Sequence, residues 1–587
     1  MITIQSALSS KFLQAMQKAF PLAGITSVMV EVTPSTQGQF GHYQCNSAMK
    51  LASVLKMKPR DIAQAIVSHL DLSNSHHQLM IAASTIAGPG FINVTLDPSY
   101  LAKRTQKMLV DAHLGIEKVQ PKKKLIIDFS SPNTAKEMQV WHLRSTIIGD
   151  CLARLFEFLG YDVLRLNHVG DWGTAFGMLI AHMKEKAGKV LAGGEQTDLS
   201  HLVEWYRESK KRFDEDANFK KRAQQEVVAI QSGDIQSLQA WQIICAISRK
   251  AYQEIYDLLD VKITERGESF YNPLLAAVVA DLERKEMVTL SAGAKCIFLE
   301  GFANREGALL PLMIQKSDGG FNYATTDMAA IRHRIQDEKA NRIIYVTDAG
   351  QSMHFQMIFK AAEQAGYLDP NNVTVNHVPF GLVLGQDGKK FRTRTGDTER
   401  LLDLLLAAIQ KAKEILIERN VDMTPNEIEN TAKILGINAI KYADLASQRT
   451  SDYLFSYDRM LRFEGNTAAF LMYAYVRING IKRKVGIENI ASLIKSTSIK
   501  LEHPAEITLA LHLNQFGEVL QQMSEDLYPH RLTEYLYKLA EYFNGFFRDC
   551  RVEGDKAQNS RLLLCETVAE VMRRGLMILG LKVVERM

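Results

Sequence analysis

Cysteine is scarce in this sequence, and its few copies lie far apart. The chain has 6 cysteines in 587 residues, and no two of them form a C-x-x-C pair. This spacing argues against a structural zinc site and against a disulfide framework. We therefore expect reduced thiols that pack in the interior. The cysteines are Cys45, Cys151, Cys245, Cys296, Cys550 and Cys565.

Long apolar runs and a strong charge of one sign are also missing. The richest apolar run, Leu401–Ile409, is short for a membrane span and contains Asp403. The first residues, Met1–Gln5, lack the basic start and the apolar stretch of a signal peptide. We therefore expect a cytoplasmic protein with no membrane partner. A net charge of +4 does not by itself indicate nucleic-acid binding, although it permits a local basic face.

What is present is an ordinary globular composition spread over a long chain. With 46% apolar and 23% charged residues, the sequence is typical of a soluble protein. A chain of 587 residues is too long for one hydrophobic core, so we expect three or four domains. Residues 1–115 mix helical stretches with short strands at Ser27–Val32 and Phe91–Leu96, and Gln120–Lys124 is typical of a linker.

Two strand–helix–strand patterns follow, and both are typical of parallel sheets. The apolar run Leu125–Phe129 is the kind of strand that such sheets bury on both faces. The first unit comprises this strand, a turn at Ser130–Asn133, a helix at about Glu137–Leu159 and a strand at Asp162–Leu166. The second comprises a strand at Arg342–Val346, a helix at Gln351–Ala365 and a strand at Val373–Val378. They predict a doubly wound, Rossmann-like parallel sheet divided by an insertion at about residues 175–315.

The last third of the chain has a helical pattern. Asp397 is the expected N-cap of a helix in which Leu401, Leu405 and Ile409 recur at helical spacing. Helical patterns then dominate to Met587, without an internal repeat. The expected fold class is α/β: a parallel-sheet domain with an insertion, an α+β N-terminal domain and an all-α C-terminal helix bundle.

Polar and basic residues follow each predicted strand, at the edge where open parallel sheets bind ligands. Lys136, His142 and Arg144 stand near a helix N-terminus, where free N–H groups and the helix dipole favour phosphate. The segment Gly170–Gly173 is a tight turn that fits either packing or a ligand loop. In Leu384–Gly396, glycines flank a cluster of cations, which suits the β- and γ-phosphates of ATP.

Taken together, these segments resemble the class I aminoacyl-tRNA synthetases, and specifically the arginyl-tRNA synthetases. The resemblance rests on motifs in the family's order and covers nearly the whole chain. The motifs are Gly41–Asn46, Ala87–Phe91, S-S-P-N-T-A-K-E-M at 130–138, H-V-G-D-W-G at 168–173, Asp318–Asp327, Phe463–Thr467 and the closing Leu581–Met587. It implies that arginine reacts with ATP to give arginyl-adenylate and pyrophosphate, and that the arginyl group then moves to tRNA(Arg).

The resemblance also implies roles for individual residues. Thr393 stands where class I enzymes carry a catalytic lysine, and Lys136 fills the place from which many members of the family compensate. Carboxylates such as Asp128 and Asp327 suit a guanidinium, although Asp327 also fits a helix N-cap. The aromatic residues near the C-terminus fit a packed core as well as stacking on bases. Catalysis falls to Lys136, His142, Lys390, Arg392 and Arg394, and ATP binding to Gln139, Trp141, His142, Gly170, Asp171, Gly173 and Lys389. The arginine pocket falls to Asp128, Asn133, Tyr323, Asp327 and Gln351, and tRNA binding to Tyr43, Asn46, Phe470, Tyr473 and Arg477.

The family's domain plan implies boundaries, substrates and partners. Residues 1–115 would bind the tRNA elbow, 120–396 would form the catalytic domain with its insertion, 397–455 would be a linking helical region that contacts the stem, and 456–587 would bind the anticodon. The substrates are L-arginine and ATP, the latter as its Mg²⁺ complex. The expected partner is tRNA(Arg), and the expected protein is a monomer without zinc.

Two residues depart from the family's ATP signature. Gln139–His142 stands in place of H-x-G-H, so Gln139 and Trp141 replace a histidine and a glycine. Loss of one transition-state donor costs about 3 kcal/mol, or about a hundredfold in rate. An indole at position 141 either occupies the adenine site or stacks on the base. The alternatives are a working ligase with an altered adenine site, favoured by the retained Lys136 and Asp327, a tRNA-binding paralogue with impaired catalysis, and a natural sequence altered at 139 and 141.

Overall fold

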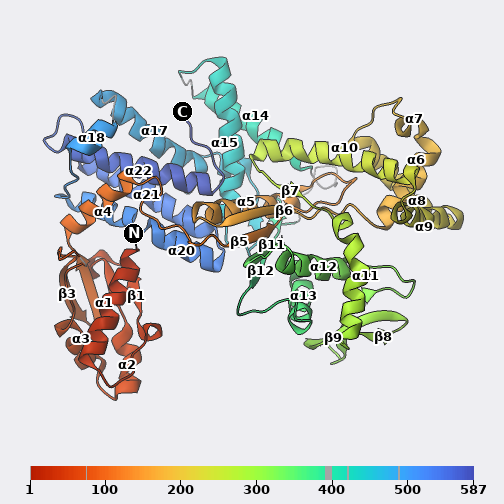
Figure 1. The fold of residues 1–587 in the computed structure, drawn as a ribbon. Helices are drawn as coiled ribbons and strands as arrows, with labels where there is room; N and C mark the ends of the chain where they lie inside the picture. The colour runs from red at the N-terminus through yellow and green to blue at the C-terminus, as the bar shows by residue number, and fades with distance from the viewer. Residues whose placement is uncertain (1, 75, 390–399, 420–421, 487–489) are drawn as a thin grey trace. The chain divides into compact units, whose positions relative to one another are not determined.

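The computed structural model describes residues 2–74, 76–389, 400–419, 422–486 and 490–587 (Figure 1). Its contacts divide the chain into two compact units. The first, here called the central unit, contains residues 119–461 and 578–581. The second, here called the terminal unit, contains residues 1–118, 462–577 and 582–587.

The central unit is built on a five-stranded parallel sheet. The strand order is β12-β11-β5-β6-β7, and each neighbouring pair runs parallel. Leu125, Ile126 and Ile127 are fully buried, as expected for a strand covered on both faces. Both predicted strand–helix–strand units are confirmed. The strands are β5 Lys124–Asp128, β6 Asp162–Asn167, β7 Thr264–Glu265, β11 Arg342–Asp348 and β12 Thr374–Phe380.

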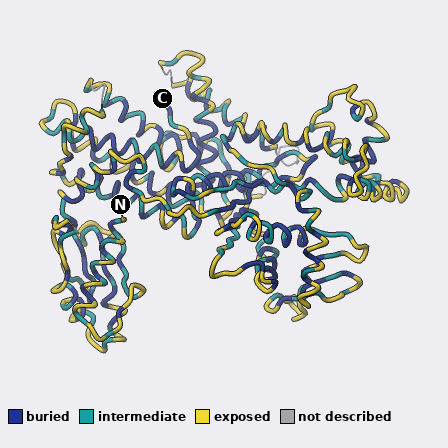
Figure 2. Tube along the Cα trace, in the orientation of Figure 1, coloured by how far each residue is buried: buried dark blue, intermediate teal, exposed yellow. Residues whose placement is uncertain are grey.

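Three helices connect to these strands: α5 Val140–Phe158, α12 Tyr323–Gln336 and α13 Ser352–Gln364. Met328 of α12 and Ile358 of α13 share one hydrophobic core with Ile343 of β11. Figure 2 draws the buried residues of the chain in dark blue. The helix predicted at 137–159 begins at Val140, because Gln139 is its N-cap.

The stretch between β6 and β11 holds most of the helices of the central unit. Trp172, Trp205 and Trp241 pack against a separate small core in this region. The two-residue strand β7 lies within the predicted insertion, yet it belongs to the main sheet because Leu166 and Asn167 pair with it. The helices are α6 Thr174–Lys186, α7 Gly188–Leu191, α8 Leu199–Glu215, α9 Ala217–Ser232, α10 Ile235–Leu259 and α11 Glu268–Arg284. An antiparallel sheet of order β10-β9-β8 follows, with β8 Thr289–Ser291, β9 Ala294–Ala303 and β10 Leu309–Gln315.

The central unit continues into two long helices, α14 Leu401–Glu418 and α15 Pro425–Ala446. The predicted helix beginning near Leu401 is confirmed, and Arg400 occupies the N-cap position. The predicted cap, Asp397, lies outside the described residues. The short strands β13 Val383–Leu384 and β14 Tyr453–Leu454 pair in parallel, and the helix α16 Tyr457–Met460 follows them.

The N-terminal part of the terminal unit contains an antiparallel sheet of order β1-β2-β4-β3. The strand predicted at Phe91–Leu96 is confirmed as β4. The strand predicted at Ser27–Val32 is wrong for most of its length, because Ser27–Met29 forms the 3-10 turn η1 and Val28 is 88% exposed. The other strands are β1 Val32–Pro34, β2 Tyr43–Cys45 and β3 Ile81–Ala87, and the 3-10 turn η2 is Gly38–Phe40. The helices are α1 Ile4–Ala19, α2 Ser47–Leu55, α3 Pro59–Ser68 and α4 Pro98–Val110.

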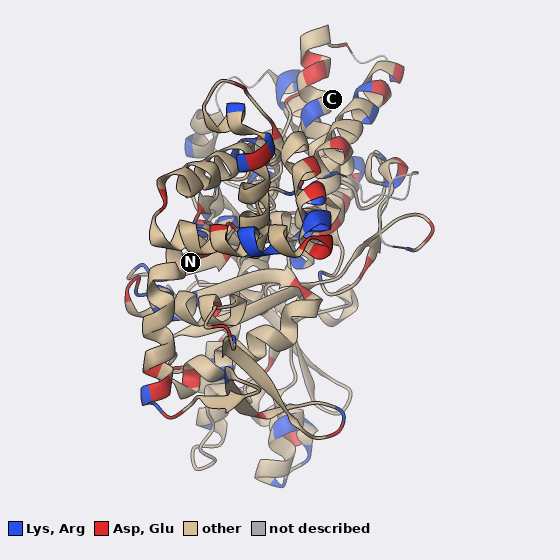
Figure 3. Ribbon diagram, turned by 90° about the vertical axis from the view of Figure 1, so that its right-hand side faces the viewer, with Lys and Arg blue, Asp and Glu red and all other residues tan. Residues whose placement is uncertain are grey.

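The C-terminal part is helical, which confirms the predicted bundle. Lys and Arg lie among Asp and Glu on the same helices (Figure 3), in keeping with the small net charge. In the described part of the chain, no helix combines the length and apolarity needed to span a bilayer. The helices are α17 Ala468–Val485, α18 Ile490–Ser496, α19 Pro504–Asn514, α20 Phe516–Asp526, α21 His530–Asp549 and α22 Gln558–Ile578.

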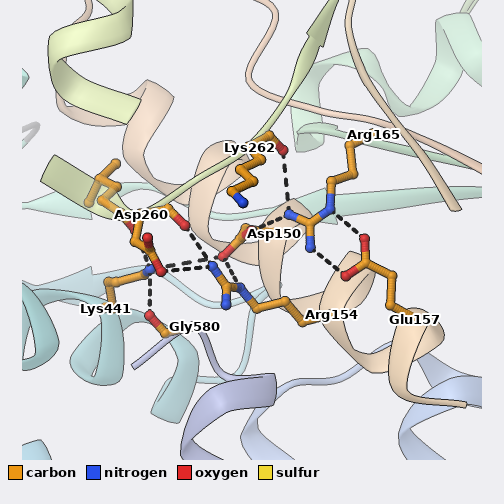
Figure 4. Close-up of polar contacts among 9 residues, drawn as sticks. Asp150, Arg154, Glu157, Arg165, Asp260, Lys262, Lys441 and Gly580 are labelled. Carbon is orange, nitrogen blue, oxygen red and sulfur yellow. Dashed lines mark hydrogen bonds and ion pairs between the residues drawn. The ribbon is translucent and has the colours of Figure 1, made fainter. Parts of the chain in front are cut away.

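Residues 578–581 return to the central unit and end at a buried ionic cluster (Figure 4). Lys441 Nζ donates to the carbonyls of Leu259 (2.6 Å) and Gly580 (2.7 Å). Asp150 of α5 lies 3.9 Å from this ammonium and pairs with Arg154 at 2.8 Å. A Cβ at Gly580 would lie 2.8 Å from the Asp150 carboxylate, so this close approach depends on glycine.

Candidate active site

The turn after β5 has an uncommon backbone conformation. Ser130, Ser131 and Ala135 have φ of 70°, 48° and 60°, a region that costs free energy for residues other than glycine. The amide of Thr134 donates to the carbonyl of Gly170 at 3.0 Å. The turns after β5 and β6 therefore lie side by side at the carboxyl edge of the sheet, where parallel sheets bind ligands.

The turn after β6 combines close packing with a helix cap. A Cβ at Gly170 would lie 2.3 Å from Oδ1 of Asn133, so a side chain there would displace Asn133. The buried carboxylate of Asp171 accepts hydrogen bonds from the amide (2.8 Å) and the hydroxyl (2.6 Å) of Ser269. Burial raises the pKa of Asp171. Gly173, with φ of 105°, stands before α6. Asp171, which we expected to bind ATP, thus accepts hydrogen bonds at the start of α11.

Gln139 and His142 cap the N-terminus of α5. The backbone carbonyl of Gln139 accepts from the amide of His142 at 2.9 Å, and Nδ1 of His142 accepts the Gln139 amide hydrogen at 3.0 Å. Burial lowers the pKa of His142 to about 4. The imidazole is therefore neutral at pH 7, and since Nδ1 accepts, Nε2 carries the hydrogen. Trp141 is 49% exposed, and its ring centroid lies 5.6 Å from that of His142.

The cations predicted near this helix have different environments. Arg144 is fully buried, with Nε 3.2 Å from Oδ2 of Asp444 and its guanidinium 5.1 Å from the centroid of the Tyr453 ring. The predicted phosphate contact of Arg144 is therefore wrong, because its charge is used inside the fold. Lys136 is exposed, and its ammonium lies 5.2 Å from the Tyr206 ring centroid on α8.

The described residues on either side of the basic loop are Lys389 and Arg400. At the first end, Lys389 is exposed, and its carbonyl accepts from the amide of Gly385 at 2.8 Å. At the second end, Arg400 pairs with Gln139 through an isolated bridge, and its Nε lies 3.3 Å from Oε1 of Glu137. Arg400 therefore lies beside the start of α5. The predicted catalytic residues Lys390, Arg392 and Arg394 lie outside the described residues.

Asp128 is engaged by a cation of the chain itself. Its Oδ2 lies 2.7 Å from Nη2 of Arg334, and both side chains are buried. Ser131 Oγ donates to Oδ1 at 3.0 Å, and His168 Nδ1 lies 3.8 Å from Oδ2. Asp128, which was predicted to bind the guanidinium of the substrate, thus already pairs with the guanidinium of Arg334.

Asp327 lies in the second turn of α12, so the alternative that it caps a helix is wrong. The cap is Asn322, whose side chain accepts from the amide of Thr325. Oδ2 of Asp327 lies 2.6 Å from Nε2 of His354, a residue that the sequence analysis missed. Tyr323 is 63% exposed, and its ring centroid lies 4.9 Å from that of His354.

A cleft of about 2180 Å³ opens in front of this group. Glu268 lines it, a second residue that the sequence analysis missed. Burial and the neighbouring carboxylates of Asp171 and Asp327 raise the pKa of Glu268 to about 7. Glu268 stands just after strand β7, much as Asp128 stands at the end of β5. It was missed because a two-residue strand gives no periodic signal in the sequence. Other lining residues are Gly173, Arg266, Asn322, Tyr323, Met353 and His354.

Two further predicted arginine-site residues, Asn133 and Gln351, are exposed. In the described part of the chain, no three His, Cys, Asp or Glu side chains group closely enough to hold a metal ion. All six cysteines are free and buried, as predicted.

The residues predicted to bind tRNA lie in the terminal unit. Tyr43 is fully buried, and its Oη donates to Oε1 of Glu518 at 2.8 Å. This burial does not fit a direct contact between Tyr43 and RNA. Asn46 is half-buried at the N-cap position of α2, and its side chain makes no cap hydrogen bond there.

On α17, an aromatic and basic group reaches the surface. Tyr473 is 41% exposed, and the Arg477 guanidinium lies 5.0 Å from its ring centroid. Arg477 also donates to Oδ1 of Asn544 at 2.7 Å. Phe470 is half-buried, with its ring centroid 5.5 Å from that of Tyr537.

Three family descriptions match the chain in consecutive segments. Residues 6–96 match "Arginyl tRNA synthetase N terminal domain", and residues 104–457 match "tRNA synthetases class I (R), catalytic domain". Residues 471–587 match "DALR anticodon binding domain".

Relatives and solved structures match over the full length. A protein of Protochlamydia amoebophila named arginine–tRNA ligase is 62% identical, and one of Chlamydia caviae with the same name is 50% identical, each covering 100% of both chains. The crystal structure of arginyl-tRNA synthetase from Plasmodium falciparum is similar with a TM-score of 0.85 at 33% identity, covering 100% of both chains. The Thermus thermophilus arginyl-tRNA synthetase, 21% identical over 100% of both chains, shares the fold with a TM-score of 0.79.

Proposed function

The chain belongs to the arginyl-tRNA synthetase family, and from that premise we propose that it activates L-arginine with ATP and transfers the arginyl group to tRNA(Arg). The observation that carries this function is 62% identity, over the full length of both chains, with an arginine–tRNA ligase. Nothing in the described residues or the relatives favours the alternative of an impaired paralogue. The chain also retains Lys136 and a neutral, donating His142 at the start of α5.

ATP, as its Mg²⁺ complex, is proposed to bind at the N-terminus of α5. Lys136 and Nε2–H of His142 would contact phosphate there, helped by the free amides of the helix end. The bridge between Arg400 and Gln139 supports this location, because Arg400 directly follows the basic loop in the sequence. Lys389, Lys390, Arg392 and Arg394 are proposed to supply the remaining positive charge from that loop.

Arginine is proposed to bind in the cleft beside α12. Asp327 and Glu268 would hold its guanidinium and Tyr323 would pack against it, with Asn133 and Gln351 nearby as polar contacts. The raised pKa of Glu268 supports this, since a half-buried acid beside two other carboxylates suits a cationic ligand. Asp128 would then stabilise the site through Arg334 without touching the substrate.

The terminal unit is proposed to bind tRNA, with Tyr473, Phe470 and Arg477 contacting anticodon bases and Asn46 in the elbow-binding part. Stacking rings beside a guanidinium fit unpaired bases. We further propose a monomer that acts in the cytoplasm. The predicted domain boundaries at 115, 396 and 455 remain part of this proposal.

The decisive test is arginylation by the purified chain with arginine, MgATP and tRNA(Arg). We expect arginyl-tRNA to form, and lysine in place of arginine to give no product. Lys136→Ala should lower kcat by about a hundredfold, while the exposed-surface control Lys360→Ala should not change it. Absence of arginyl-tRNA with well-folded protein would contradict the proposal.

A further inference from the structure

One face of helix α10 makes hydrogen bonds to both turns of the candidate site. The residues are Trp241, Ser248, Tyr252 and Tyr256, which recur at helical spacing on the longest helix between β6 and β7. All four make these bonds from partly or fully buried positions.

The central contacts hold the turn that carries Asn133 and Lys136. Tyr252 Oη lies 2.7 Å from the carbonyl oxygens of both residues, which share its one hydrogen. Burial raises the pKa of Tyr252, so its hydroxyl keeps the hydrogen that it donates. One turn earlier on α10, Ser248 Oγ accepts the amide hydrogen of Ala135 at 3.0 Å. Lys136 and Asn133 are thus held by their backbone while their side chains are exposed.

The outer contacts of the same face reach the neighbouring segments. Tyr256 Oη lies 2.8 Å from Oγ of Ser130 and 3.1 Å from Nδ2 of Asn167. Trp241 Nε1 donates to the carbonyl of Asp171 at 2.8 Å. One helix face thus bonds to the turn after β5, the end of β6 and the turn after β6.

The turn after β5 is strained, so the hydrogen bonds from α10 stabilise its conformation in addition to packing the helix against it. Ser130, Ser131 and Ala135 each have positive φ, and such residues persist only where the surroundings determine their conformation. The far end of α10 is also fixed, because the Leu259 carbonyl accepts from Lys441 in the buried cluster of Figure 4. A helix fixed at its end can hold the turn in one conformation.

We propose that α10 positions the catalytic turn, and that Tyr252 and Ser248 are positioning residues for Lys136 and Asn133 in the activation of arginine. This inference rests on the proposed function for its kinetic consequences. Its structural part, the restraint of residues 130–136 by α10, stands independently of any activity.

Tyr252→Phe tests the proposal, because it removes one hydroxyl and keeps the ring. The matched control is Tyr367→Phe, since Tyr367 is equally buried and its hydroxyl donates to Asp281 at 2.7 Å, a bond that does not involve the turn. In ATP–pyrophosphate exchange with tRNA present, we expect Tyr252→Phe to lower kcat about tenfold with a smaller change in KM. Tyr367→Phe should keep the kcat of the parent chain at a similar loss of Tm.

Amide hydrogen exchange of residues 130–138 gives a readout without activity. We expect faster exchange there in Tyr252→Phe and in Ser248→Ala, and no change in Tyr367→Phe. If Tyr252→Phe does not fold, Ser248→Ala tests the proposal by the same two measurements, ATP–pyrophosphate exchange and amide hydrogen exchange. Unchanged exchange in the turn, or equal losses of kcat in Tyr252→Phe and Tyr367→Phe, would overturn the proposal. If the parent chain forms no arginyl-tRNA, the proposed function is contradicted. The hydrogen-exchange measurement would still test whether α10 restrains residues 130–136.

Discussion

Asp128 and Arg334 form a buried ion pair, with Oδ2 of the acid 2.7 Å from Nη2 of the guanidinium. The pair links the end of β5 to α12, and His168 lies beside it with Nδ1 3.1 Å from the same nitrogen. A carboxylate that already holds a buried cation is poorly placed to bind a second one. This geometry separates the structural acid, Asp128, from Glu268, which lines the cleft, and from Asp327, which contacts the cleft residue His354.

The first prediction follows from this pair. Asp128→Ala should destabilise the central unit by about 3–5 kcal/mol, because it leaves a buried guanidinium without its counter-charge. Denaturant unfolding measures the loss, and the KM for arginine of the folded fraction should change little. Asp327→Asn should behave the opposite way, with a raised KM and a small change in stability. A stable Asp128→Ala protein with a greatly raised KM for arginine would contradict this and indicate that Asp128 binds the substrate.

The pairing of Asp128 also shows where sequence reasoning ended. Apolar runs and turn residues predicted β5, α5 and β6 because those signals are local. The partner of an acid depends on which distant helix packs against it, and no local pattern indicated Arg334 or the Asp444 that holds Arg144. Strand β7 was missed for a related reason, since two residues carry no periodicity, and Glu268 was missed with it.

Glu268→Gln tests the arginine pocket through its pH dependence. The pKa of Glu268 is raised to about 7 in the free protein, so its carboxylate becomes ionised as pH rises through 7. A guanidinium binds the ionised form, and KM for arginine should therefore fall between about pH 6 and pH 8. Glu268→Gln should raise KM by about ten- to a hundredfold, the value of a charged hydrogen bond, and flatten this profile.

The control for this measurement is Glu300→Gln on β9, because Glu300 is exposed at the surface. It should keep both the KM and its pH profile. A Glu268→Gln variant with the parent's KM at every pH would remove Glu268 from the pocket.

The altered ATP signature leads to a third prediction. Gln139 occupies the N-cap position of α5, where its amide donates to Nδ1 of His142, and Trp141 is half-exposed in the first turn. The pair Gln139→His and Trp141→Gly should raise kcat/KM for ATP, by up to about a hundredfold if position 139 regains a transition-state donor. The glycine should lower helix stability by about 0.5–1 kcal/mol. Comparing each single change with the pair separates the two sites, and an unchanged or lower kcat/KM in all three would show that the adenine site already accommodates the indole.

The last prediction concerns the terminal unit, where Glu518 joins two of its parts. Its Oε1 accepts from the Gln5 amide and from Tyr43 Oη, both at 2.8 Å. Burial raises the pKa of Glu518 from an ordinary 4.5 to about 7, against opposing effects of these two bonds and of Arg104. Between these values the unfolded chain loses its proton while the folded chain keeps it. The stability that the protonated acid contributes is therefore fully present below about pH 4.5 and is lost as pH rises to 7, by up to about 3 kcal/mol.

Glu518→Gln should remove this loss, because the amide does not titrate. Exchange of the Gln5 amide reports the local opening, and its protection should fall from pH 5 to pH 7, after correction for intrinsic rates, in the parent chain but not in Glu518→Gln. Glu525→Gln, at an exposed acid of the same helix, should keep the parent's pH dependence. Because other carboxylates titrate equally in all three proteins, the difference between variants isolates Glu518. Identical pH profiles in the parent and in Glu518→Gln would mean that the acid is already ionised where it meets Tyr43.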